Sequence, residues 1–376
     1  MKDRQLSNEM VGSNDAYNDG NSKPLNADSS GRAILRQIPR NTMKFDIFNA
    51  LAEYGHSSKL SIHDGDAIEG FFANARSKLV DSLASPTFLH GQRTHSMFEA
   101  LVVTLGGVRL IKQEDSGVVH TEDDPLFVPD FHLVLRDGSR YLIEVKNFNP
   151  NGDFRKNFTL RRSYLDGLTR YAALMSCSLM IAIYWVGWNL WTLLPADIFQ
   201  TKREKLSVNF FQAMKSNHMA ILGDRDVATT PPLMLRIDVD HTKERTVKQN
   251  GQTEFTIGNI RLFCKDQEIV ESTERSIAMY LMLYGKWRES NRAIISNDQL
   301  DAIEFMLEPE ETTLQGFEFV GSLSSLFSSY YLSTTSDEET VAQIHAGFTP
   351  GFLGQLIPDE YEGSALPIWR FKLKPT

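Results

Sequence analysis

Residues 129–147 read PDFHLVLRDGSRYLIEVKN, two short apolar runs joined by a turn. Both runs are rich in aromatic and β-branched residues, and the Asp-Gly pair between them is a strong hairpin signal. A half-buried strand has little reason to hold charged side chains, yet Asp130, Glu144 and Lys146 lie in or beside these runs. The stretch therefore predicts a β-hairpin whose charged residues serve a function.

The register of this hairpin decides whether the charged residues meet. A three-residue loop at 137–139 pairs His132 with Glu144 and Asp130 with Lys146. Because side chains alternate along a strand, these four residues then share one face, whereas a two-residue loop would separate the two carboxylates. Two carboxylates and an ammonium group suit Mg²⁺ or Mn²⁺, which use few carboxylates and keep several waters. We therefore expect a divalent-metal site on one face of the hairpin.

Pro-Asp followed by Glu-Val-Lys resembles the motif of the PD-(D/E)XK nuclease superfamily, whose members have a restriction-endonuclease-like fold. The resemblance implies that Asp130 and Glu144 bind the metal and that Val145 lends its carbonyl. It also implies that Lys146 orients or activates the attacking water. Members often add a Glu from a preceding helix, and Glu99 in HSMFEALVVTL is the matching position. His132 is expected to support the metal site from outside its direct ligands.

The sequence around the motif agrees with such a core over about residues 90–195. Related nucleases carry Gln-x-x-x-Tyr on the helix after the motif; here Tyr171 is present, but Gly167 stands where Gln would be. This departure argues against the recombination-exonuclease branch, and no subfamily is identified. The expected core elements are a helix at 92–105, a strand at 108–111, a helix at 158–176 and a fully apolar strand at 178–186.

The length of 376 residues predicts two domains and a tail. Residues 1–42 read as a disordered tail, 43–205 as the nuclease-like domain, and 206–376 as a smaller, acidic α+β accessory domain. The last part should contain strands at 233–239 and 253–265, and helices at 272–286, at 298–307 and from Ser336 onward.

No apolar run is long enough to span a bilayer, and the two cysteines, Cys177 and Cys264, lack metal-type spacing. We therefore expect a reduced, cytoplasmic compartment, no membrane association and no zinc site.

Charge is distributed unevenly along the chain. The net charge of −9 opposes broad DNA affinity, but residues 293–369 contain thirteen acidic residues and no Lys or Arg. The acidity is thus concentrated away from the motif. The candidates for contact with DNA phosphates follow the motif directly and are Arg155, Lys156, Arg161, Arg162 and Arg170.

These features predict a Mg²⁺- or Mn²⁺-dependent endonuclease that hydrolyses phosphodiester bonds, with DNA favoured over RNA by the resemblance alone. A multi-protein transposition or phage-defence system is one setting, and the acidic domain would bind a protein partner or shield the basic helix. The alternative for the acidic domain is that it simply has a solvated acidic surface. A homodimer is a further possible partner. The alternative function is a catalytically idle, nuclease-like DNA-binding or scaffold subunit. Rival candidates for the acidic ligand at Glu99 are Glu122, Asp123 and Asp124.

Overall fold

The computed structural model describes residues 35, 42–114, 119–122, 125–153, 155–202, 205–309, 313, 315–338, 340–358 and 360–375. The predicted tail, 1–42, therefore lies almost wholly outside the described residues. No helix among the described residues is both long and apolar enough to cross a membrane.

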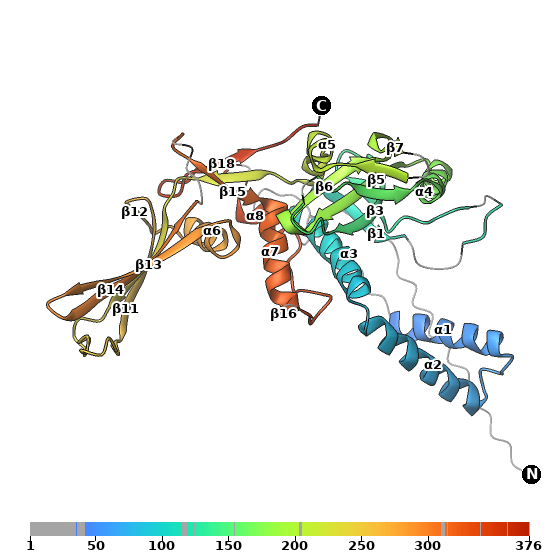
Figure 1. The fold of residues 1–376 in the computed structure, drawn as a ribbon, viewed down its shortest axis with the longest axis horizontal. Coiled ribbons are helices and arrows are strands. Elements are labelled where there is room, and N and C mark those ends of the chain that lie inside the picture. Colours follow the sequence, from blue (N-terminus) through green and yellow to red (C-terminus); the bar gives the residue numbers. More distant parts are fainter. Residues whose placement is uncertain are drawn as a thin grey trace, which may run out of the picture. The chain divides into compact units, whose positions relative to one another are not determined.

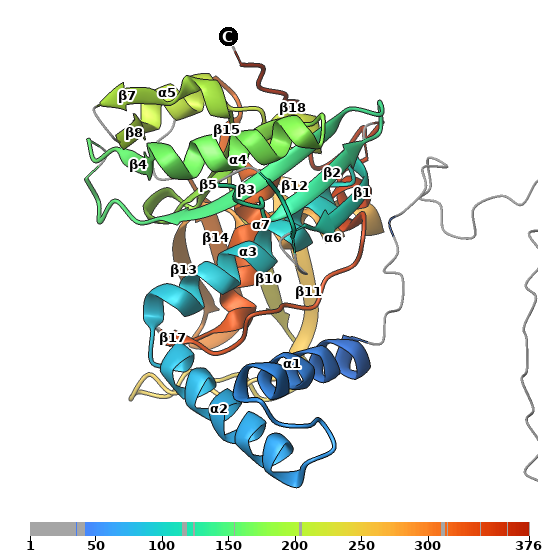
Figure 2. The ribbon, with the colours of Figure 1, turned by 90° about the vertical axis from the view of Figure 1, so that its right-hand side faces the viewer.

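A mixed five-stranded sheet contains the hairpin, with strand order β1-β2-β3-β5-β6 (Figure 2). Neighbouring strands are antiparallel except for β3 and β5, which are parallel and joined by a crossover through helix α4, Arg162–Leu174. This arrangement confirms the predicted α/β class, a mixed sheet flanked by helices. The strands are β1 (Val108–Gln113), β2 (Phe131–Leu135), β3 (Arg140–Phe148), β5 (Ser178–Trp185) and β6 (Leu190–Pro195).

Two helices cover the sheet from opposite faces. Alternate residues of β3 divide between two hydrophobic cores: Ile143 and Val145 join the core that includes α3, Pro86–Leu105, and Leu142 joins the core that includes α4. Helix α3 begins six residues before the predicted start at 92. The reason is local, because Ser85 caps the helix by accepting a hydrogen bond from Phe88 N at 3.3 Å and proline is favoured at the first helical position.

The hairpin register differs from the prediction by two residues. Strand β2 pairs His132 with Leu142, not with Glu144, because the three-residue loop is 136–138 and not 137–139. Leu135 N donates to Ser139 O at 2.8 Å, and Gly138, with φ +88°, takes the left-handed position at the end of the loop. A slip of two residues keeps every side chain on its face.

The start of α4 also differs from the prediction. Residues Phe158–Arg161, predicted as helical, form strand β4, which pairs with β8, Lys205–Val208, in a small sheet of order β4-β8-β7. Phe158 and Leu160 are buried while Thr159 and Arg161 are exposed, which is the alternation of a strand. Strand β7 is Gln200–Lys202.

The remaining chain forms a second five-stranded sheet, order β12-β11-β10-β14-β13, and a three-stranded sheet, order β15-β9-β18 (Figure 1). The strands are β9 (Asp226–Thr229), β10 (Leu233–Val239), β11 (Ile257–Cys264), β12 (Gln267–Ile269), β13 (Arg288–Ser296), β14 (Gln299–Glu308), β15 (Glu318–Ser322) and β18 (Ile368–Phe371). The helices are α5 (Phe210–Lys215), α6 (Ser272–Tyr284), α7 (Leu323–Thr335) and α8 (Phe352–Leu356), and the N-terminal pair is α1 (Thr42–Ser58) and α2 (Gly65–Leu83).

Two helices predicted in this region are wrong. The helix predicted at 298–307 is replaced by strand β14, Gln299–Glu308, in which Ala302 and Glu304 are buried. Glu304 accepts hydrogen bonds from Arg236 and Arg292 on the two neighbouring strands. Cross-strand pairing thus overrides a pattern that looks helical. The segment from Ser336 onward contains the short strands β16 (Ser336–Asp337) and β17 (Thr340–Val341), and the helix α7 precedes it. Strand β10 and helix α6 lie where they were predicted.

Helix α7 packs against the first sheet and links the two halves of the chain. Trp191 Nε1 on β6 donates to Ser328 Oγ at 2.9 Å, and Asn189 Nδ2 donates to Ser329 Oγ at 2.8 Å. One hydrophobic core accordingly contains residues from Met97 to Leu366. The proposed boundary between residues 205 and 206 stays a prediction.

Candidate active site

Asp130 lies immediately before β2, where the ladder between β2 and β3 ends. Continuing the register by one residue places it opposite Glu144. Its Oδ2 accepts a hydrogen bond from Val145 N at 2.6 Å, so the carboxylate takes the place of a strand carbonyl. The sheet thus holds this carboxylate directly against the strand that carries the rest of the motif.

Glu144 is 1% exposed and points toward α4. Its Oε1 accepts hydrogen bonds from Tyr164 OH at 2.6 Å and from Lys146 Nζ, while Oε2 has no partner among the described residues. Burial, followed by the nearby charge of Asp130, raises the pKa of this carboxyl above its ordinary value, and the two donors only partly oppose that rise. A cation bound at Oε2, in addition to the Lys146 ammonium at Oε1, would stabilise the ionised form of this buried carboxyl.

Lys146 lies on the same face as Glu144, with which it forms an ion pair. Its ammonium is 5.2 Å from the centre of the Tyr164 ring. Since the Lys146 side chain is still 29% exposed, its amine can reach a water or a phosphate as well as Glu144.

These donors fit a hard divalent cation. No group of three or more His, Cys, Asp and Glu side chains in the described ranges is placed to hold a metal. Mg²⁺ needs no such group, because it commonly binds through one or two carboxylates and keeps its remaining waters. Asp130 and Glu144 supply two carboxylates, and the buried, unpartnered Oε2 of Glu144 is an acceptor that a cation would satisfy.

Glu99, the expected third acid, is directed elsewhere in this structure. Its Oε2 accepts a 3.4 Å hydrogen bond from Gln113 Nε2, and no described bond joins it to Asp130 or Glu144. The α3 residue that approaches the motif is His95, one turn earlier. Its Nε2 lies 3.8 Å from Asp130 Oδ1, so a catalytic role of Glu99 remains a prediction.

His132 shares a sheet face with the motif, as expected from alternation. Its Nε2 lies 3.7 Å from Cys177 Sγ, and its direct cross-strand neighbours are Leu142 and Lys112. The register places it two residues along β2 from Asp130. Its supporting role at the metal site remains a prediction.

Glu114 is a residue that sequence reasoning missed. It follows β1 and stands opposite Asp130, to whose carbonyl its N–H donates at 2.9 Å, so Glu114, Asp130 and Glu144 form one row across three strands. Its carboxylate accepts hydrogen bonds from Lys112 Nζ at 3.0 Å and Tyr171 OH at 2.9 Å. Burial alone would raise the pKa of Glu114, but these two hydrogen bonds hold it below the ordinary value. Extending the predicted strand at 108–111 by three residues would have found the row.

The five basic candidates have different surroundings. Arg170 donates from Nε and Nη2 to the carbonyl of Pro125 at 3.0 and 2.7 Å, which is a structural contact. Arg162 Nε lies 3.8 Å from Asp166 Oδ2. Arg155 Nε donates a hydrogen bond to Asp153 Oδ1 at 3.2 Å within its own loop.

Lys156 lies 5.9 Å from the centre of the Phe148 ring, and Arg161 is exposed at the end of β4. Contact of any of the five with DNA remains a prediction. Of the rival acids, Glu122 is exposed and has no described link to the motif, and the other two lie outside the described residues.

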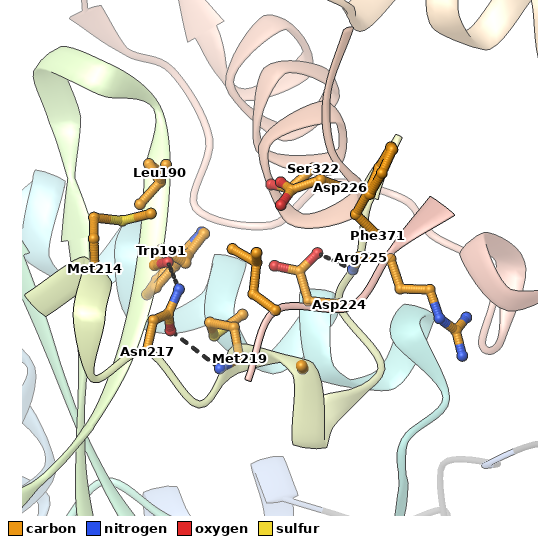
Figure 3. A pocket seen from close by; sticks show the side chains of 12 residues that line it. Leu190, Trp191, Met214, Asn217, Met219, Asp224, Arg225, Asp226, Ser322 and Phe371 are labelled. Atoms are coloured by element: carbon orange, nitrogen blue, oxygen red, sulfur yellow. Dashed lines mark hydrogen bonds between the residues drawn. The ribbon is translucent and has the colours of Figure 1, made fainter. Parts of the chain in front are cut away.

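A separate small cavity of about 30 Å³ lies between β6, β9 and β18, and none of the predicted site residues lines it (Figure 3). Asn217 spans part of its wall by donating to Trp191 O at 3.2 Å and accepting from Met219 N at 3.1 Å. Asp224, also in the wall, accepts from Arg225 N and from Ser324. These hydrogen bonds engage the side chains of Asn217 and Asp224 within the fold, and the volume suits a single water.

Fold and site together define a mixed α/β protein in which two carboxylates and a lysine meet where a strand ladder ends. Among solved structures, the chain is similar to Hjc, a Holliday junction resolvase from the archaeal hyperthermophile Archaeoglobus fulgidus. The identity is 14% and the TM-score 0.23, over 29% of this chain and 84% of the resolvase. No protein-family model matches the sequence. No curated protein matches it either.

Proposed function

We propose that this chain is a Mg²⁺- or Mn²⁺-dependent endonuclease of the PD-(D/E)XK type that hydrolyses phosphodiester bonds in DNA. The observation that carries the proposal is the buried contact of Glu144 with Lys146 and Tyr164 beside Asp130, with one carboxylate oxygen unpartnered. Such a group is costly in a core and is retained most readily where it is used. DNA as the substrate rests on the family resemblance.

Each motif residue has a distinct role in this proposal. Asp130 and Glu144 would hold the cation, and the Val145 N–H fixes the orientation of the Asp130 carboxylate. A bound divalent ion supplies charge neutralisation at the phosphate and a water of lowered pKa. Lys146 would turn from Glu144 toward that water and orient it for attack on phosphorus, a movement that its exposed ammonium permits. Glu99 would join only after leaving Gln113.

We also propose a protein partner for the acidic C-terminal part, in a transposition or phage-defence system. Its support is the absence of Lys and Arg from 293–369. Two of the thirteen acids do not contribute to an acidic surface, because Glu304 and Glu318 are only 2% and 5% exposed. The remaining exposed acids define the surface to be tested with candidate partners.

The proposal is tested by incubating linear, circular, single-stranded and branched DNA with the full chain and Mg²⁺ or Mn²⁺. Wild type should cut at least one substrate. Asp130→Asn, which keeps an oxygen to accept from Val145 N, and Lys146→Met, which keeps the length of the side chain, should each lower the rate at least about 100-fold.

Asp137→Asn is the matched control, because Asp137 lies in the same hairpin and accepts from Ser139 N at 2.9 Å but is far from the motif along both strands. Its rate should equal that of wild type. Cleavage that survives Asp130→Asn in folded protein would contradict the proposed site. Absence of both cleavage and divalent-metal binding in wild type would favour the idle, nuclease-like subunit.

A further inference from the structure

Helix α2 uses one face to pack against α1. Figure 2 shows the two helices side by side. Ala67 is fully buried on this face, and the rings of Phe71 and Tyr54 meet edge to face at 6.1 Å. Gly70 lies directly under the Tyr54 hydroxyl, where a Cβ atom would collide with it. The two helices therefore form a close-packed antiparallel pair.

The opposite face of α2 carries an exposed apolar stripe. Ile68, Phe72, Leu79 and Leu83 are 39%, 58%, 62% and 66% exposed. At about 100° per residue, these four side chains project within an arc of about 60°. Single exposed apolar residues are ordinary, but a continuous stripe of four over four helical turns marks an interaction surface.

We propose that this stripe binds the α2 helix of a second copy of the chain in antiparallel orientation. Together with Ala75, three members of the stripe, Ile68, Phe72 and Leu79, are spaced alternately four and three residues apart. This is the spacing that forms a seam between two helices. With the two helices antiparallel, Ile68 faces Leu79 of the second copy and Phe72 faces its Ala75. Each large ring is thereby matched to a small side chain.

Charge supports the same register. Glu69 and Arg76 flank the stripe on the same side, seven residues apart. In the antiparallel pair each Glu69 lies next to Arg76 of the second copy, and the two-fold axis makes this contact twice. A parallel pair would instead bring Phe72 against Phe72 and would leave Glu69 and Arg76 of the two copies on opposite sides of the seam, without this pairing. Both the size and the charge pattern of α2 therefore fit a second copy of itself.

This inference does not depend on the proposed nuclease activity, because none of the α2 residues contacts the motif. The test is sedimentation equilibrium of the full chain with charge-reversed variants. Wild type should be a dimer. E69R and R76E each replace two attractive pairs by two repulsive ones and should weaken dimerisation by roughly tenfold or more.

The double variant E69R/R76E restores opposite charges and should recover the affinity to within about threefold of wild type. An equimolar mixture of the two single variants should form the heterodimer. Asp81→Arg, on the same helix but on another face, is the matched control and should dimerise like wild type. A monomeric wild type, or a dimer whose affinity neither single variant changes, overturns the inference.

Discussion

Tyr164 contacts two of the three motif residues at once. Its hydroxyl donates to Glu144 Oε1 at 2.6 Å, and its ring lies 5.2 Å from the Lys146 ammonium. Seven residues later on α4, Tyr171 makes an equivalent hydrogen bond to Glu114, at the other end of the acid row. The same helix face therefore contacts both end residues of the row, and of these two only Glu144 belongs to the motif.

If the chain cleaves DNA as proposed, replacing Tyr164 by Phe should lower the cleavage rate by roughly tenfold with little loss of stability. The ring stays, and a single hydrogen bond to the Glu144 carboxyl is lost. The measurement is the single-turnover rate at saturating DNA, together with titration of Mg²⁺. Tyr171→Phe is the control, with the rate close to that of wild type. Equal effects of the two changes would show that the hydroxyls act only through the stability of α4.

Helix α4 leaves no room for a side chain at residue 167, the position where the sequence resemblance to PD-(D/E)XK nucleases would place a Gln. Gly167 is buried against Phe127, whose ring in turn lies 4.9 Å from that of Tyr164. A Cβ at residue 167 would overlap the Phe127 ring. The space that Gln would take is thus filled by an aromatic residue from the loop before β2.

Gly167→Ala should therefore lower the free energy of unfolding by about 1–3 kcal/mol, since the clash outweighs the better helix propensity of Ala. Gly91→Ala is the matched control, because Gly91 lies within α3 and a Cβ there would meet nothing within 4 Å. That change should raise the free energy of unfolding by about 0.5–1 kcal/mol. Urea denaturation compares the two, and effects of the same sign would contradict the packing argument.

At the scale of the whole molecule, Asp224 ties the segment before β9 to the start of α7. Its carboxylate accepts from Ser324 N at 2.9 Å and from Ser324 Oγ at 2.6 Å. Burial raises the pKa of Asp224 to about 6, and the hydrogen bonds from Ser324 do not cancel this effect. The folded state therefore binds this proton more tightly than the unfolded state does.

Because its pKa is higher in the folded state, Asp224 stabilises the fold most below about pH 4. As the pH rises to about 6, this contribution to the free energy of unfolding falls by about 3 kcal/mol. Asp224→Asn should reduce the fall in stability between pH 4 and pH 6. Denaturant titrations at these two pH values measure it. Asp240→Asn, at an exposed turn, should leave the fall unchanged. An unaltered pH dependence in Asp224→Asn would contradict the assignment.

The alternation in residues 129–147 is sufficient to predict that Asp130, Glu144 and Lys146 share a face, because the side-chain period of a strand is two and a two-residue slip preserves it. Likewise, the apolar run of β5 predicts a strand covered on both faces. The α/β class of the core was expected from the resemblance to PD-(D/E)XK nucleases and not from these local patterns.

Tertiary structure alone determines the other features. Glu114, Tyr164 and Tyr171 reach the acid row only through sheet pairing and helix packing, between residues up to 57 apart in sequence. The sequence of strand β14 looks helical in isolation, but its buried Glu304 is paired by Arg236 and Arg292 from the two neighbouring strands. Local sequence sets which face a side chain occupies, but which partners meet on that face depends on contacts that no local pattern encodes.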